Sequence, residues 1–99
     1  MKEFVLKLYV TGKTPRADRA IANLRSLCEA HFAGRYQIEV IDVLERPKLA
    51  EEEKIFATPT LIKYLPSPIR WVVGDLSDKE NVLLGLDLRP HPEDMDQGA

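Results

Sequence analysis

The chain has 99 residues, which is room for one domain with one hydrophobic core. Hydrophobic residues make up 44% and charged residues 30%, a composition typical of a folded domain and not of a disordered chain. The formal net charge of −2 gives no electrostatic reason to expect nucleic acid as a partner. No apolar run approaches the length of about 18 residues that a membrane span needs, and no signal peptide precedes the first strand-like segment. We therefore expect a cytoplasmic protein.

The chain has too few cysteine and histidine residues for disulfide formation, dithiol redox chemistry or a metal cluster. Cys28 is the single cysteine, so neither an intramolecular disulfide nor a dithiol pair can form. His31 and His91 lie far apart in the sequence, which argues against a metal cluster. We accordingly predict no catalytic residue, no metal site and no cofactor.

The first half of the chain predicts a strand, a helix and a second strand. Residues 4–10 are nearly all apolar and β-prone, which is typical of a central strand covered on both faces. Thr14 is a natural N-cap and Pro15 fits the first helical position. Apolar residues then recur at helical spacing until Gly34, and residues 36–44 indicate a second buried strand. Together these elements predict a βαβ unit with a right-handed crossover.

The second half predicts a short helix followed by a β-hairpin. Pro47 begins the helix, and its early turns are expected to hold the acidic run 51–53, with Lys54 near its end, a charge order that complements the helix dipole. Residues 60–64 and 69–73 then indicate two strands joined by a tight connection.

The last predicted element is ambiguous. Ser77, followed three places later by Glu80, forms a capping-box pattern that predicts the start of a helix. Residues 82–88 fit a helix that ends near Gly85, but they also fit the alternation of a strand. The simple interpretation is a C-terminal helix. The alternative is that two packings of this half differ by only a few kcal/mol.

Pro59 directly precedes the strand predicted for residues 60–64. Proline has no N–H to donate to a sheet, so it belongs at the first residue of a strand, and an X-Pro bond can be cis at modest cost. Residues 57–61, Ala-Thr-Pro-Thr-Leu, resemble the cis-proline corner of thioredoxin-like folds. Together with Pro66 and Pro68, Pro59 would make exchange between alternative packings slow.

Two motifs with known chemistry are incomplete. Residues 11–14, Thr-Gly-Lys-Thr, stand where thioredoxins carry Cys-x-x-Cys, so thiol redox chemistry is excluded. The same residues mimic the end of a P-loop, but the glycine required five places before Gly12 is Lys7. Cys28 lies on the apolar stripe of the first helix, which favours a buried, inert thiol.

The predicted hairpin carries an aromatic and basic group. Trp71 and Tyr64, with Lys63 and Arg70 beside them, would suit a protein interface, where Trp, Tyr and Arg are enriched. Packing of the two aromatic rings in the core is an equally good interpretation.

Six blocks of the sequence resemble the KaiB family of circadian clock proteins. The blocks are residues 6–12, 40–44, 49–52, 57–61, 74–77 and 85–88. This resemblance implies a non-enzymatic timing protein that binds the N-terminal ATPase ring of KaiC and regulates its phosphorylation cycle. It also implies an α/β domain with two folds. The ground state is usually a tetramer, whereas the form that docks on KaiC is a thioredoxin-like monomer with the order βαβαββα.

The resemblance also implies how the chain is divided. Residues 1–49 would form the βαβ half shared by both folds, residues 50–89 the half that refolds, and residues 90–99 a flexible acidic tail. Gly85 and Asp87 fall where the family sets the balance between the folds. The side expected to face KaiC carries Lys54, Lys63, Arg70 and Trp71.

Some interpretations stay open. Trp71 departs from relatives that tend to have a second basic residue there, and a KaiA-type partner is expected only if the organism has one. The alternative is the thioredoxin-like, KaiC-binding sensor domain of a SasA-type histidine kinase, although kinase sequence should follow such a domain, and here an acidic tail follows. A thiol-dependent enzyme could act only through Cys28.

Overall fold

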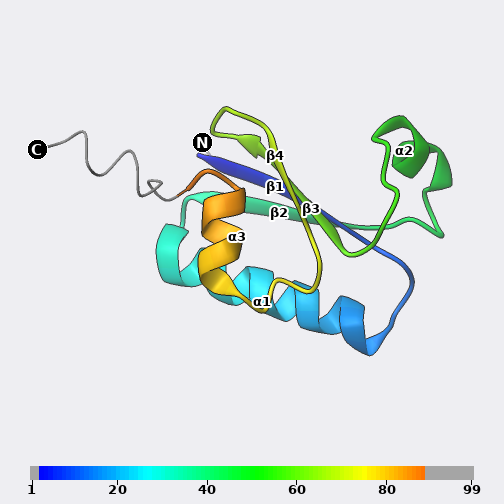
Figure 1. Cartoon of the computed structure of the whole chain (residues 1–99), viewed down its shortest axis with the longest axis horizontal. Coiled ribbons are helices and arrows are strands. Elements are labelled where there is room, and N and C mark those ends of the chain that lie inside the picture. Colours follow the sequence, from blue (N-terminus) through cyan, green and yellow to red (C-terminus); the bar gives the residue numbers. More distant parts are fainter. Residues whose placement is uncertain (1–2, 89–99) are drawn as a thin grey trace, which may run out of the picture.

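The computed structural model describes residues 3–88, which fold around one four-stranded sheet (Figure 1). The elements are β1 (Phe4–Val10), α1 (Pro15–Phe32), β2 (Tyr36–Asp42), α2 (Pro47–Glu52), β3 (Thr60–Leu65), β4 (Arg70–Val73) and α3 (Lys79–Gly85). The strand order is β2-β1-β3-β4; β1 is parallel to β2 and antiparallel to β3, and β4 is antiparallel to β3. The predicted βαβαββα order is therefore confirmed. The predicted tail, residues 90–99, lies outside the described residues.

Helix α1 begins where the sequence predicts. The Thr14 hydroxyl accepts a hydrogen bond from the backbone N–H of Ala17 at 3.1 Å, and Pro15 occupies the first turn, where a missing N–H leaves no bond unmade. Gly34 follows the helix with a φ of 76°, a left-handed conformation that glycine adopts without strain.

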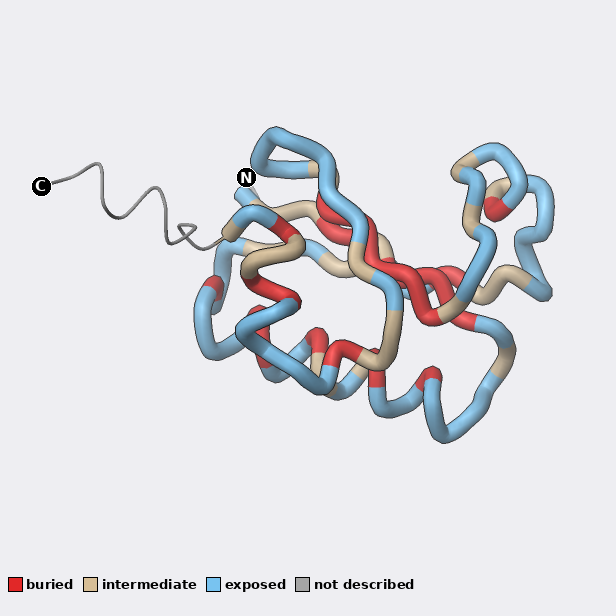
Figure 2. Tube along the Cα trace, in the orientation of Figure 1, coloured by how far each residue is buried: buried red, intermediate tan, exposed pale blue. Residues whose placement is uncertain are grey.

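The main core lies between the sheet and helices α1 and α3, which cover the same face (Figures 1 and 2). Its buried side chains are Leu6, Leu8, Val10, Ala17, Ala20, Leu24, Leu27, Cys28, Phe32, Leu61, Leu76, Val82, Leu83 and Leu86. At one end of this core the rings of Phe4 and Phe32 stack with their centroids 4.0 Å apart. Residues 82–85 are helical and the helix ends at Gly85, so the helical interpretation of the ambiguous stretch is confirmed.

The second face of the sheet is covered less completely. Tyr9, Ile41 and Ile62 are buried there. Partly buried residues from α2 and its flanking loops pack against them, among them Leu49 and Ile55. Because α2 lies near one end of the sheet (Figure 1), the β4 side of this face stays open.

The expectation of a second buried strand over residues 36–44 is wrong in two respects. Strand β2 pairs only with β1, so it is an edge strand, and only Ile41 in it is buried. The strand also ends at Asp42, whose Oδ1 accepts hydrogen bonds from the N–H of Leu44 at 2.9 Å and of Gly12 at 3.0 Å. The carboxylate thus caps the turn that follows β2.

Two details of the predicted helices also differ. The N-cap of α3 is Asp78 and not Ser77, because the Asp78 carboxylate accepts from the backbone N–H of Asn81 at 3.2 Å. In α2, Glu51 and Glu52 occupy the last positions, so these charges do not complement the helix dipole as predicted.

The bonds Thr58–Pro59, Leu65–Pro66 and Ser67–Pro68 are cis, in agreement with the cis-proline corner expected at Pro59. No helix within residues 3–88 is both long and apolar enough to cross a membrane.

Candidate functional site

The loop where thioredoxins carry their thiols here contains hydroxyls. It meets the Pro59 corner through Thr11 and Thr58, whose Oγ1 atoms lie 2.7 Å apart. Thr14 caps α1, and Gly12 binds the Asp42 carboxylate through its N–H. Across residues 3–88, no group of His, Cys, Asp and Glu side chains could hold a metal ion. This corner therefore offers neither a thiol nucleophile nor a metal.

The Cys28 thiol is unsuited to nucleophilic attack. The residue is completely buried, and this burial, with a smaller effect of Glu29, raises the pKa of the thiol to about 12. The thiolate is the reactive form of cysteine, so a thiol with this pKa is almost fully unreactive at neutral pH. The predicted inert role for Cys28 thus agrees with the geometry, and a thiol-dependent mechanism has no support.

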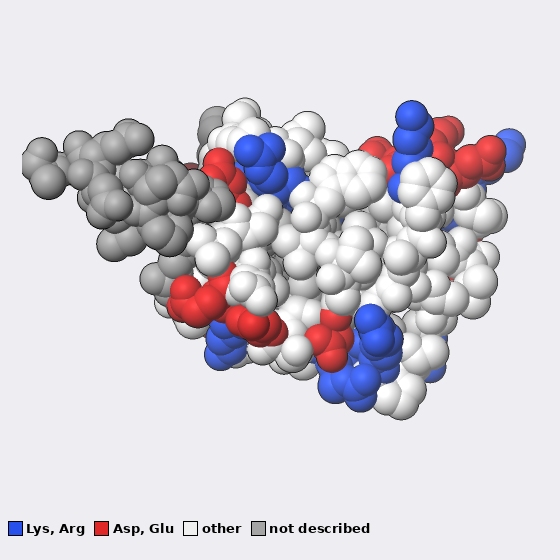
Figure 3. All heavy atoms as spheres, viewed as in Figure 1, with Lys and Arg blue, Asp and Glu red and all other residues white. Residues whose placement is uncertain are grey.

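Exposed apolar side chains gather instead on the β3–β4 hairpin. We define the hairpin patch as Ile69, Trp71 and Val73, which alternate along the β4 segment and have exposed fractions of 54%, 47% and 61%. Leu65, exposed by 47%, alternates with Lys63 and so lies on the other side of the hairpin. Trp71 lies opposite Ile62 in the β3–β4 register, and therefore on the face that the helices leave open. Figure 3, viewed as in Figure 1 with β4 and the helices in sight, shows an uncharged area across the middle of the molecule, with charged side chains at its borders. A clustered apolar patch with a polar rim is typical of a protein interface.

The predicted partner-binding residues are not brought together as one group. Arg70 and Trp71 are neighbours on β4 and both are exposed. Lys54 is exposed too, but it follows α2 near the start of β3, whereas Arg70 pairs with the residue near the end of β3. The surface thus offers two separate points of contact.

Lys63 differs from its expected place on the surface. Its register opposite Leu6 puts it on the same face as Leu61, beneath the helices, and its exposed fraction is 0%. In the described conformation Lys63 therefore cannot touch a partner.

Phe56 is an exposed residue that the sequence analysis did not single out. It lies in the loop between α2 and β3, its exposed fraction is 91%, and it shares a surface hollow with Lys54 and Ile55. In the sequence it is part of the apolar run that leads into β3, so its composition alone suggested burial. Only the position of the loop in the structure shows that Phe56 is a second exposed aromatic residue, in addition to Trp71.

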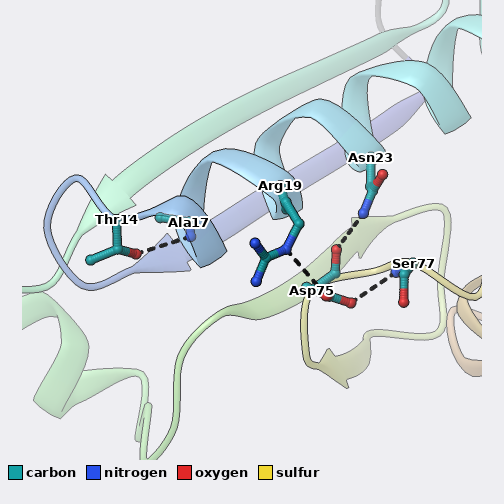
Figure 4. A network of polar contacts seen from close by, with 6 residues as sticks. All are labelled: Thr14, Ala17, Arg19, Asn23, Asp75 and Ser77. Carbon is teal, nitrogen blue, oxygen red and sulfur yellow. Dashed lines mark hydrogen bonds and ion pairs between the residues drawn. The ribbon is translucent and has the colours of Figure 1, made fainter.

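A polar network ties α1 to the connection between β4 and α3 (Figure 4). The side-chain amide of Asn23 donates to the backbone carbonyl of Asp75 at 2.8 Å. The Asp75 carboxylate accepts from the N–H of Ser77 at 3.1 Å and lies 3.7 Å from the Nε of Arg19. Hydrogen bonds from Ser77 hold the pKa of Asp75 below its usual value. This network joins the first, βαβ half of the chain to the second half.

Asn23→Ala should lower the free energy of unfolding by about 1 kcal/mol, because the carbonyl of Asp75 loses a partly buried donor. Arg19→Ala is the matched variant on the same helix, and we expect a change below about 0.5 kcal/mol because the ion pair is exposed. Urea unfolding of both variants measures this difference. Equal midpoints for Asn23→Ala and the wild type would contradict a structural role of the network.

The fold, together with the hydroxyl-bearing loop of residues 11–14 beside Pro59, defines a thioredoxin-like domain without the thiol pair of a thioredoxin. Similar solved structures include the N-terminal domain of SasA from Synechococcus elongatus, with a TM-score of 0.72, 23% identity and coverage of 92% of this chain and 90% of that one. Mitochondrial thioredoxin 3 from Saccharomyces cerevisiae is another, with a TM-score of 0.68, 16% identity and coverage of 88% and 79%.

The family follows from the sequence comparisons. The KaiB domain family model matches residues 7–88. The circadian clock oscillator proteins KaiB of Parasynechococcus marenigrum and Microcystis aeruginosa are each 59% identical to this chain over 87 residues, covering 88% of it and 84% of those proteins. The chain belongs to the KaiB family. The resemblance stated from the six sequence blocks is thereby confirmed.

Proposed function

We propose that this chain is a non-enzymatic, cytoplasmic regulator that binds the N-terminal ATPase ring of KaiC and thereby controls the phosphorylation cycle of KaiC. The observation that carries the proposal is the fold itself. A chain of the KaiB family here has the thioredoxin-like fold of the SasA N-terminal domain. This is the form that the family resemblance associates with docking on KaiC. The 59% identity to KaiB proteins favours this role over that of a SasA-type sensor domain.

Binding would use the two exposed points of the surface. On β4, Trp71 supplies a large apolar anchor on the open face, and Arg70, paired with Lys63, supplies an exposed cation on the other side of the same edge strand. Near α2, Phe56 and Lys54 combine an exposed aromatic ring with an exposed cation. A partner surface with apolar hollows and carboxylates would complement both points.

The rate of binding would be limited by the population of the thioredoxin-like form. If residues 50–89 also adopt a second packing, only the fraction in the described form can bind, and the apparent affinity falls by that fraction. A scarce binding form makes assembly slow, which is a useful property in a timing protein. In the second packing the chain would form the tetramer expected from the family.

The experiment that tests this function compares the two rings of KaiC. We expect the chain to form a stable complex with the isolated N-terminal ATPase ring and none with the isolated C-terminal ring, as measured by size-exclusion chromatography after overnight mixing. A complex with the C-terminal ring alone, or with neither ring, would refute the proposal.

A further inference from the structure

Lys63 is a buried charge that binding to a partner does not explain. In β3 it alternates with the core residue Leu61 and faces the helices, and its neighbours across the sheet are Leu6 on β1 and Arg70 on β4. Its ammonium group is buried and makes no hydrogen bond to any of residues 3–88. The inside of the domain thus contains a lysine head group without a hydrogen-bond acceptor.

The charges around Lys63 compensate its burial only in part. The carboxylate of Asp87, just beyond α3, attracts the ammonium, whereas the guanidinium of Arg70 repels it. Burial is the largest effect and lowers the pKa of Lys63 below its ordinary value. A buried charge without hydrogen bonds destabilises a fold, and apolar replacement of buried charges is often stabilising.

We propose that Lys63 acts as a built-in destabilising charge, which keeps the thioredoxin-like form scarce relative to any state in which this side chain reaches water. The effect on KaiC binding rests on the proposed function, but the effect on the stability of the fold does not. Lys63 would thus regulate binding from inside the domain, without touching the partner.

Lys63→Met tests the inference because methionine keeps an unbranched side chain of similar length and removes the charge. We expect the ratio of the thioredoxin-like form to all other states of the chain to rise about fivefold at pH 7, measured from the intensities of the separate NMR resonances of that form. Lys54→Met is the matched control, since Lys54 is exposed and should give an unchanged ratio. An unchanged or lower ratio for Lys63→Met would overturn the inference.

The pH dependence has a defined sign. Because the pKa of Lys63 is lowered in the folded state, the destabilisation is fully present below that pKa and disappears as the pH rises towards the ordinary value of 10.5. The advantage of Lys63→Met over the wild type should therefore shrink with rising pH. The comparison between variants is needed because burial raises the pKa values of Tyr9, Tyr64 and Cys28, and these groups make both proteins less stable at high pH.

A second measurement uses the unmodified chain. An NMR titration of the Lys63 ε-methylene, followed on the resonances of the thioredoxin-like form, should give a pKa below the ordinary value of 10.5, and a pKa at or above that value would overturn the inference. Neither measurement contains KaiC. If Lys63→Met stabilises the fold but leaves KaiC association unchanged, the inference stands and fold-limited binding is the part that fails.

Discussion

Trp71→Ala is expected to weaken binding to the N-terminal ring of KaiC by about 30-fold or more. This factor corresponds to about 2 kcal/mol, the usual effect of removing a central aromatic anchor from an interface. Trp71 is 47% exposed on the open side of β4, so its removal deletes little of the core. Isothermal calorimetry gives the dissociation constant, and urea unfolding shows that the variant is folded.

A matched control separates this effect from a general loss of apolar surface. Val40→Ala also shortens an exposed apolar side chain, but Val40 lies on β2, at the opposite edge of the sheet, and is 36% exposed. We expect its dissociation constant to stay within about twofold of the wild type. Equal constants for Trp71→Ala and the wild type would show that KaiC docks elsewhere on the chain.

The second large effect is expected from Gly85→Ala combined with Asp87→Arg, which should raise the rate of KaiC association about tenfold. Alanine is more favourable than glycine in a helix by about 1 kcal/mol, and arginine near a helix C-terminus adds about 0.3–1 kcal/mol. Gly85 is the last residue of α3 and Asp87 lies two places beyond it. Both changes thus favour the helical form of this segment. Unchanged association kinetics in the double variant would count against the idea that the helical form of this segment limits KaiC binding.

The structure also shows what opposes this gain. A Cβ added at Gly85 would lie 2.8 Å from Cγ2 of Val72, so β4 must shift slightly to accept it. Asp87 has a φ of 59°, which aspartate tolerates better than arginine, and its carboxylate attracts Lys63. In the wild-type background, Asp87→Arg removes the attraction between Asp87 and Lys63. The increase in the association rate from Asp87→Arg should therefore be larger in the Lys63→Met background, where there is no such attraction to lose.

Local patterns were sufficient to predict much of the fold. The Thr14 cap, the hairpin and the helical course of residues 82–85 each depend on neighbours in the sequence, so spacing and turn chemistry identify them. The family blocks identified the KaiB family because they span both halves of the chain.

Features that depend on distant contacts could not be predicted in the same way. Lys63 was placed on a partner-facing surface because it lies beside Tyr64 in the hairpin and because of the family resemblance, but pairing of β3 with β1 turns this side chain towards the core. Strand β2 was expected to be buried because of its isoleucine and valine residues, yet its place at the sheet edge exposes it. The Asn23–Asp75 bond joins residues 52 positions apart, and no local signal marks it.

The most direct test of fold-limited KaiC binding is a time course of the unmodified chain with the isolated N-terminal ring, followed by fluorescence anisotropy at several ring concentrations. We predict slow association whose rate reaches a plateau as the ring concentration rises, because conversion to the thioredoxin-like form becomes the limiting step. A rate that keeps rising in proportion to the ring concentration, with no plateau, would contradict a scarce binding form.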